Sequence, residues 1–141
     1  MASGRTDIGF DSPFVSKLNF FINEKFNNEF NGEVKIEISM DTKKTNQETD
    51  DIFLYISTLC LKVGEKSDSF PFYCEIEMKG NFYRNELSNM EEEDFAKRST
   101  AAILYSYARP IISDIITKSG FPPYNLPYMD FSDLDLDEDD D

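Results

Sequence analysis

The sequence predicts an α+β fold, in which four strand-like segments are followed by one long helix. Alternation of apolar and polar residues indicates strands at 14–22 and, most clearly, at 33–40. Residues 52–63 and 70–80 are separated by the polar loop GEKSDS, which is typical of a hairpin. Residues 96–118 carry apolar side chains at three- and four-residue steps, the spacing of an amphipathic helix.

Alternation assigns the side chains of the first two strands to faces. In segment 14–22, one face should carry Phe14, Leu18, Phe20 and Ile22. In segment 33–40, Val34, Ile36, Ile38 and Met40 should face one way, and Glu33, Lys35, Glu37 and Ser39 the other. Each of these strands is therefore expected to bury one face.

The strand expected at 52–63 differs because it is apolar on both faces. One face would carry Phe53, Tyr55, Leu59 and Leu61, and the other Ile52, Leu54, Ile56 and Cys60. A strand of this kind needs cover on both sides. The protein's own helix can cover one side, so we expect a second subunit to cover the other.

The helix expected within 96–118 has recognisable signals along its length. Its apolar face would be formed by Ile103, Tyr107, Ile111, Ile115 and Ile116. Pro110 lacks a backbone N–H, so we expect a kink or a break there. Gly120 suits the left-handed position that ends a helix. Further back, Ser88 and Glu91 have the spacing of a capping box and predict a helix start.

After Gly120 the chain cannot remain helical. Pro122, Pro123 and Pro127 fix the backbone of residues 121–131 in an extended form, which we call the arm. The arm carries the large side chains Phe121, Tyr124, Leu126, Tyr128 and Phe131.

The net charge of −14 is unevenly distributed, because eight acidic residues lie within 130–141. An acidic chain without a basic stripe argues against nucleic acid and anionic membranes and favours basic protein partners. We expect residues 1–13 to be a loose lead-in, 14–131 to form one domain, and 132–141 to be a disordered acidic tail. We also expect the tail to be dispensable for folding.

The polar N-terminus, MASGRTDIGF, and the lack of an eighteen-residue apolar run predict a cytoplasmic protein. Cys60 and Cys74 form no C-x-x-C pair. If the hairpin brings them opposite each other they could form a disulfide, but two buried thiols are the favoured interpretation.

Composition argues against catalysis. The sequence has no histidine, which excludes Ser–His and Cys–His nucleophile pairs. Asp133, Asp135 and Asp137 have the first ligand spacings of a calcium loop, but Glu138 stands where glycine is needed. We therefore predict a protein that is not an enzyme and that holds neither a metal nor a cofactor.

A family resemblance appears in the helix and the arm. The residues that carry it, in order and spacing, are Leu104, Tyr105, Tyr107, Ala108, Arg109, Gly120, Phe121, Pro122, Asn125, Leu126 and Phe131. This run resembles the C-terminal half of SecB, the protein-export chaperone, and a weaker likeness reaches back to about residue 14. Ser106 and Pro110 depart from it, since the family often has proline and glutamate there. The acidic tail of ten residues, 132–141, also replaces its usual second helix.

The resemblance implies a fold and a function. The implied fold is a four-stranded antiparallel sheet with a long helix on one face, and sheets that pack between subunits, as in a homotetramer. The implied function is ATP-independent binding of unfolded or precursor polypeptides, with delivery to the SecA translocation motor for export. Two alternatives stay open: a specialised SecB-like chaperone that protects a single partner such as an antitoxin, and an acidic adaptor that is not a chaperone.

The resemblance also implies site residues. The client-binding groove would be formed by Phe26, Phe30, Phe82, Tyr83, Phe121, Tyr124, Leu126 and Phe131. A partner-binding face for the motor would be formed by Tyr73, Glu75 and Glu77, and the oligomer interface by Cys74, Ile76 and Met78. The alternative for the groove residues is that they simply cap the core.

Overall fold

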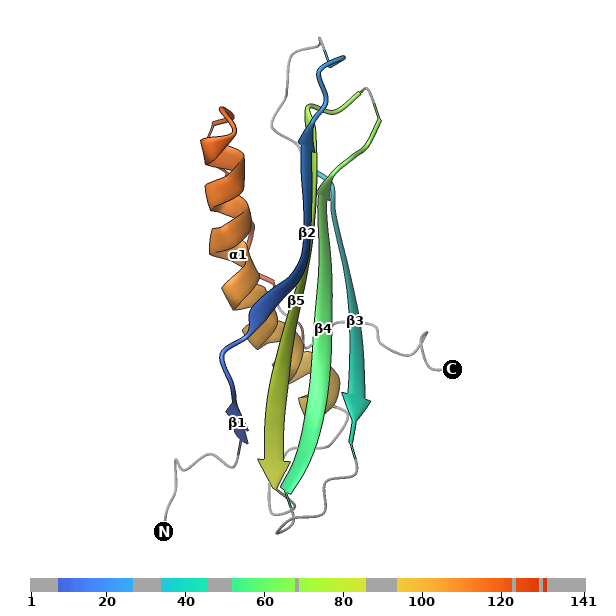
Figure 1. Ribbon diagram of the computed structural model, residues 1–141, viewed down its shortest axis with the longest axis vertical. Helices are drawn as coiled ribbons and strands as arrows, with labels where there is room; N and C mark the ends of the chain where they lie inside the picture. The colour runs from blue at the N-terminus through green and yellow to red at the C-terminus, as the bar shows by residue number, and fades with distance from the viewer. Residues whose placement is uncertain are drawn as a thin grey trace.

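The computed structural model describes residues 8–26, 34–45, 52–67, 69–85, 94–122, 124–129 and 131, and it confirms the α+β class. The strands are β1 (Ile8–Phe10), β2 (Phe14–Ile22), β3 (Ile36–Lys44), β4 (Ile52–Gly64) and β5 (Phe72–Asn85). A π-helical turn, Asp94–Ser99, leads into the helix α1 (Thr100–Lys118) (Figure 1). The sheet has one strand more than expected, because β1 forms inside the predicted lead-in. The capping box, Phe30 and the acidic tail lie outside the described residues.

The sheet is antiparallel, and β5 is its hub. The strand order is β1-β5-β4-β3, and β2 also pairs with β5. β1 pairs with residues 82–84 of β5 and β2 with residues 72–79, so the two short strands share one edge of the sheet. β3 forms the opposite edge.

A register shift between Val15 and Lys17 alters the faces predicted for β2. Leu18, Phe20 and Ile22 pair with Ile76, Cys74 and Phe72 on one side of the sheet. Phe14 pairs with Lys79 instead, so it points to the other side.

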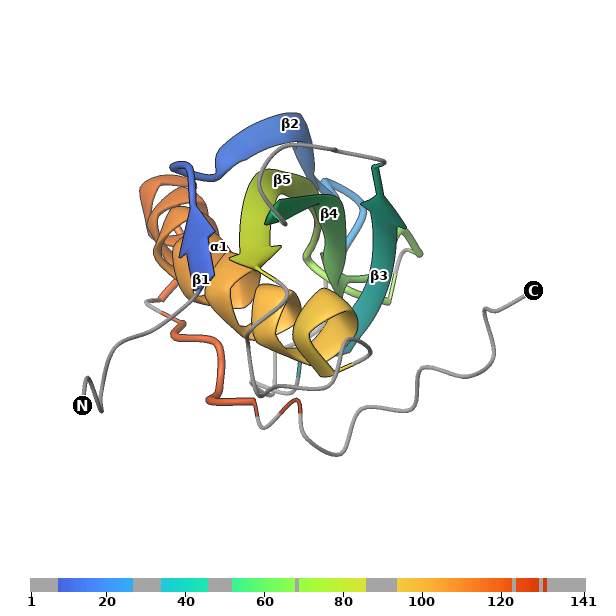
Figure 2. The same ribbon diagram turned by 90° about the horizontal axis from the view of Figure 1, so that it is seen from below.

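α1 lies across one face of the sheet (Figure 2). Its buried side chains include Leu104, Ala108, Ile112 and Ile116. Pro110 lies within the helix without ending it, so the break expected there does not occur. Gly120 has φ +95°, which confirms the left-handed residue after the helix.

The core lies between α1 and the sheet, and it corrects one prediction. Cys74, Ile76 and Met78 are at most 1% exposed and belong to this core. They were expected at an oligomer interface, but the protein's own helix already covers their face of the sheet. α1 and β5 lie closest together at Gly80, where an added Cβ atom would be only 3.2 Å from Leu104 Cδ2 on the helix.

The two cysteines lie on opposite faces of the sheet. Cys60 pairs with Glu77, whereas Cys74 pairs with Val63. Both are free thiols, which excludes the disulfide alternative, but only Cys74 is buried and Cys60 is half-buried, so the prediction of two buried thiols is confirmed for Cys74 alone. Burial, followed by the charge of Glu75, raises the pKa of Cys74 to about 11, so this thiol stays protonated at neutral pH.

Candidate functional site

The structure divides the predicted groove residues between different parts of the fold. Phe82, Leu126 and Phe131 are 0%, 1% and 5% exposed and belong to the core. Phe121 is half-buried, and its ring lies 5.0 Å from that of Phe72. These four side chains therefore follow the alternative interpretation, in which they complete the core.

The remaining predicted groove residues that the structure describes are Phe26, Tyr83 and Tyr124. Phe26 and Tyr124 are half-buried. Tyr83 is on the sheet face away from α1, where its hydroxyl donates a hydrogen bond to Asp11 Oδ2 at 3.0 Å. Tyr83 and Phe82 are neighbours on a strand and so point to opposite faces.

The arm buries Leu126 and Phe131 because it folds back along α1. The Tyr105 hydroxyl donates to the Pro127 carbonyl at 2.6 Å, and Arg109 Nη2 donates to the Leu126 carbonyl at 2.7 Å. The ring of Phe131 also packs edge-on against Tyr105 at 5.5 Å. Two main-chain carbonyls that the prolines leave outside any helix or sheet thus find donors on the helix.

The sheet face away from α1 carries Tyr73, Glu75 and Glu77, as the alternation predicts. Glu75 Oε2 accepts a hydrogen bond from Lys17 Nζ at 3.4 Å, and Glu75 Oε1 accepts one from the Tyr73 hydroxyl at 3.3 Å. Tyr73 is 7% exposed. Burial first, and then the Glu75 carboxylate, raises the Tyr73 pKa to about 12. Glu75 is therefore already engaged within the protomer.

Replacement of Lys17 by methionine should raise the pKa of Glu75. Burial pushes this pKa up, but the hydrogen bonds and charge of Lys17, with Tyr73, outweigh it and leave the pKa below its usual value. The carboxylate therefore stabilises the fold above its unfolded pKa, and this stability is lost as the pH falls through the folded pKa. Carboxyl-carbon NMR titration of both proteins measures the change, and an unchanged Glu75 midpoint would contradict this account.

A set of apolar side chains remains exposed on β1, on the helix side of β2 and on the neighbouring side of α1. This surface, which we call the β2 flank, consists of Phe10, Val15, Leu18, Ile22 and Tyr107, each 38–46% exposed. The three β2 members pair with Met78, Ile76 and Phe72 and so lie on the side that faces α1. Phe10 and Tyr107 join the strand part to the helix through a ring contact at 6.3 Å.

The β2 flank is exposed because α1 rests on the two middle strands of the sheet and not on its β2 edge. α1 packs mainly against β5 and β4, which leaves the helix side of β2 with little cover. Tyr107 belongs to the stripe that the sequence assigned to the buried face, but the buried set is Leu104, Ala108, Ile112 and Ile116. The predicted stripe is therefore divided, since Ile116 is buried, Ile103 and Ile111 pack against the core, and Tyr107 is exposed. Its regular spacing was interpreted as core throughout and did not single out Tyr107.

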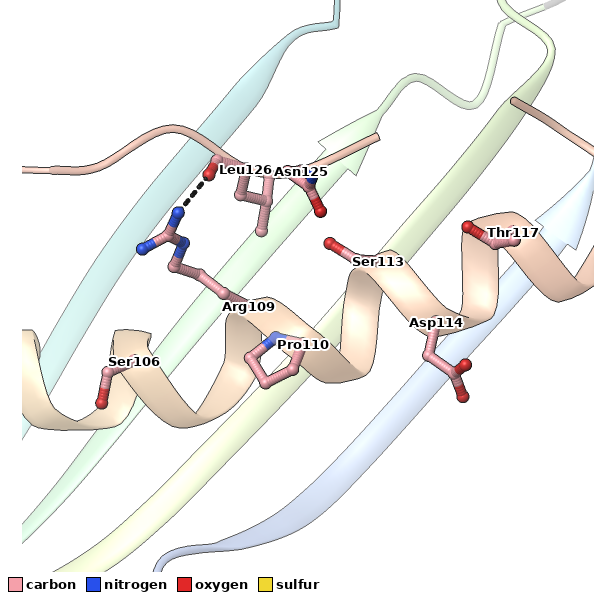
Figure 3. Close-up of a pocket in the computed structure, with 8 residues that line it drawn as sticks. All are labelled: Ser106, Arg109, Pro110, Ser113, Asp114, Thr117, Asn125 and Leu126. Atoms are coloured by element: carbon pink, nitrogen blue, oxygen red, sulfur yellow. Dashed lines mark hydrogen bonds between the residues drawn. The ribbon is translucent and has the colours of Figure 1, made fainter. Parts of the chain in front are cut away.

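A pocket lies on the other side of α1, between the helix and the arm (Figure 3). This α1–arm pocket has a volume of about 530 Å³ and is lined by Ser106, Arg109, Pro110, Ser113, Asp114, Thr117, Asn125 and Leu126. Figure 2 shows the arm and β2 on opposite sides of α1. Sequence reasoning did not predict this pocket. The available signals were the departures at Ser106 and Pro110, both of which line it.

Other kinds of site are not found in the part of the chain that the structure describes. In those residues there is no helix long and apolar enough to cross a membrane. There is also no cluster of three or more His, Cys, Asp or Glu side chains that could hold a metal ion.

Comparisons with known proteins agree on one family. The family model of the preprotein translocase subunit SecB matches residues 7–139. The protein-export protein SecB of Anaplasma phagocytophilum is 28% identical over 130 residues, which are 89% of this chain and 82% of that protein. SecB of Methylibium petroleiphilum is 32% identical over 75 residues, which are 53% of this chain and 44% of that protein.

Solved structures support the same fold. A SecB-like chaperone of Mycobacterium tuberculosis, in complex with a ChAD peptide from the HigA1 antitoxin, has a TM-score of 0.60 and 13% identity, covering 87% of this chain and 88% of that one. A Streptococcus agalactiae protein of unknown function has a TM-score of 0.63 and 12% identity, covering 89% of this chain and 100% of that one. Because the family model covers nearly the whole sequence, the chain belongs to the SecB family.

Proposed function

We propose that this protein is an ATP-independent chaperone of the cytoplasm that binds unfolded polypeptides and keeps them competent for export. The observation that carries the proposal is the exposed β2 flank. Folded monomers seldom leave a run of Val, Leu, Ile, Phe and Tyr side chains open to solvent unless the surface binds something. A chaperone needs such a surface because its clients share apolar character rather than sequence.

The charge of the protein is consistent with this role. The net charge of −14 attracts basic unfolded chains electrostatically before they touch the protein. The β2 flank then makes the apolar contact with the client. Burial of an apolar side chain of a client against the flank contributes on the order of 1.5–3 kcal/mol. Several such contacts give useful affinity without a shaped pocket.

The double substitution Val15→Ser with Tyr107→Ser should weaken client binding by at least about tenfold, or about 1.4 kcal/mol. Both side chains are exposed, so their loss should leave the fold intact. The measurement is fluorescence titration with reduced, carboxamidomethylated pancreatic trypsin inhibitor, a small basic chain that cannot fold.

The matched control is Phe14→Ser with Phe21→Ser. These side chains are 51% and 40% exposed on the same strand, but they lie on the other face of the sheet. The control should bind the client like the wild type. Equal losses in both variants would assign client binding to the strand in general, and no loss in either would place the client elsewhere.

We also propose that two copies assemble through the free edge of β2. Within the described chain β2 pairs only with β5, and it carries exposed apolar side chains on both faces. The other edge, β3, carries Glu37, Asp41, Lys43 and Lys44, and charged side chains discourage pairing between edges. β2 has a single charged side chain, Lys17, and this one already pairs with Glu75. This edge replaces the interface predicted at Cys74, Ile76 and Met78, and assembly to a tetramer remains part of the proposal.

A specialised chaperone for a single partner is the second candidate. The M. tuberculosis neighbour, which is bound to an antitoxin peptide, favours it. The two candidates differ in breadth: a general chaperone suppresses aggregation of several unrelated clients, whereas a dedicated one protects its partner alone. For the export role, the partner-binding face of Tyr73, Glu75 and Glu77 remains the proposed contact with the SecA motor.

A further inference from the structure

A second pocket lies where β4 turns into β5, beside the start of β3 (Figure 1). It is on the sheet face away from α1 and has a volume of about 410 Å³. Its lining is more polar than apolar and consists of Lys35, Glu37, Lys62, Gly64, Glu65, Lys66, Ser67 and Tyr73. Three lysines therefore gather at one site in a chain that has twice as many acidic as basic residues. We call this site the lysine pocket.

Two of the three lysines have no acidic partner in the part of the chain that the structure describes. Lys35 Nζ lies 3.7 Å from Glu37 Oε2, so this pair is largely neutral. Lys62 is half-buried and Lys66 is exposed, and neither forms a salt bridge with a described residue. The Lys66 ammonium lies over the Tyr73 ring, 5.1 Å from its centroid, which holds it at the pocket. The chemistry of the site therefore suits an anion.

The walls of the lysine pocket are fixed by hydrogen bonds. The Gly64 N–H donates to the Lys35 carbonyl at 2.9 Å and joins the end of β4 to the start of β3. Asn23 Nδ2 donates to the Ser67 carbonyl at 2.6 Å, which ties the hairpin loop to the end of β2. The Ser67 hydroxyl donates to Glu65 Oε1 at 3.3 Å, so this carboxylate is engaged within the loop. The lysines are thus presented by a pre-formed site.

The chain itself supplies an anion of matching chemistry. The acidic tail, residues 132–141, carries seven carboxylates in ten residues. In its first half they alternate with Leu134 and Leu136, so an extended tail presents these carboxylates on one side. A carboxylate-rich segment of this kind can meet several ammonium groups at once.

The described residue before the tail lies on the β3 side of the helix. The Phe131 ring packs against Tyr105 at 5.5 Å. Tyr105 and Tyr107 point about 200° apart around α1, and Tyr107 contacts Phe10 on β1. Phe131 is therefore directed away from β1 and towards β3, which forms the other edge of the sheet.

The tail is long enough to pass this edge and reach the lysine pocket. The Thr42 hydroxyl donates to the Ala96 carbonyl at 2.6 Å, which places the start of the helical segment against β3. Lys35 is seven residues from Thr42, or about 23 Å along the strand. Ten extended residues span up to about 33 Å.

We propose that the lysine pocket binds the acidic tail, residues 132–141, of the same chain. Each exposed ion pair is weak, but the tether gives the tail an effective concentration in the millimolar range. A Kd of about 1 mM for the free tail therefore gives about half occupancy in the intact chain. Docking of this strength contributes little to folding, in keeping with a tail that is dispensable for it.

Docking of the tail would regulate access to the neighbouring surface. Tyr73 lines the lysine pocket and also belongs to the partner-binding face proposed above with Glu75 and Glu77. A docked tail covers one end of that face, and a basic partner that draws the tail away uncovers it. This consequence rests on the proposed function, whereas binding of the tail does not.

A full-length variant in which every carboxylate of residues 132–141 is replaced by its amide tests docking within the chain. Amide signals of Lys62 and Lys66 in ¹H–¹⁵N NMR spectra should differ between this variant and the wild type, and those of Lys43 and Lys79 should not. The difference should vanish at about 1 M salt, where the Debye length is about 3 Å. Identical pocket signals at low salt would overturn the proposal. Differences that fade when the wild type is diluted would assign the tail to another copy and overturn docking within one chain.

Lys62→Gln with Lys66→Gln tests the pocket, and Lys43→Gln with Lys79→Gln is the matched control. Both double variants remove two positive charges from the same sheet face, but the control residues do not line the pocket. The probe is a peptide with the sequence of residues 132–141, titrated into the amide-tail protein and followed by NMR. The pocket variant should weaken binding by about fivefold, the effect of losing two exposed ion pairs, and the control by less than about twofold. Equal effects would show attraction to overall charge only and overturn the site.

Two further results keep this test separate from folding and from the chaperone proposal. Lys66→Gln alone changes an exposed side chain, so it should leave the fold intact and still weaken the peptide by about twofold. An unchanged affinity in this variant and in the double variant would overturn the site. No client is present in these measurements, so loss of client binding would overturn the chaperone proposal and leave the docked tail standing.

Discussion

Leu126→Ala should lower the free energy of unfolding by about 2–5 kcal/mol, the range for a buried leucine that leaves a cavity. Leu126 is 1% exposed and anchors the arm beside α1. Its loss also loosens the hydrogen bonds from Arg109 and Tyr105 to the arm. Urea unfolding followed by circular dichroism measures the change.

Tyr128→Ala is the control, since it alters the same arm two residues further on. Tyr128 is 80% exposed, so its replacement should change the free energy of unfolding by less than about 0.5 kcal/mol. If Leu126→Ala proved as mild as Tyr128→Ala, the arm would not be part of the core. Leu126 would then return to the exposed groove in which the sequence placed it.

Leu18→Lys should convert the assembled protein to a monomer. The Asn23 N–H donates to the Pro71 carbonyl at 2.8 Å, so the odd-numbered residues of β2 direct their main-chain groups towards β5. The main-chain groups of Leu18, near the middle of the strand, therefore point outwards at the free edge. A lysine there puts a charge on the apolar side of the strand at the point where two copies would pair.

Light scattering at micromolar concentration checks this prediction. The wild type should give at least twice the protomer mass of 16.3 kDa, and Leu18→Lys should give a mass close to 16.3 kDa. Ser39→Lys places the same charge near the middle of the exposed β3 edge and should leave the assembly unchanged. A monomeric wild type, or an equal response to both lysines, would rule out pairing through β2.

Local sequence patterns predicted the elements well. Period-two alternation placed β2 at the residues where it is observed, and it placed β3, β4 and β5 to within a few residues. Gly120 was assigned its left-handed role, since the requirement for positive φ is local and independent of packing. The match to the SecB family over residues 7–139 was likewise carried by motif residues visible in the sequence.

The prediction of sites was weaker because a site depends on which side of an element is covered. The faces of β5 were separated correctly, but Cys74, Ile76 and Met78 were given to a second subunit and not to α1. Leu126 and Phe131 were expected in a groove because the prolines only specify an extended arm. Periodicity gives the angle between residues around a helix, but it does not give the position of the sheet.

The sequence alone determined the α+β class, the strand and helix segments, the acidic charge and the absence of histidine, since each follows from composition or local spacing. The tertiary structure decided that α1 rests on β5 and β4, and this position buries Ile112 and exposes Tyr107. It also decided that the arm folds back to form a pocket beside Pro110. These features arise from contacts between segments far apart in the chain, where packing and hydrogen-bond satisfaction select one arrangement among several that the same local patterns allow.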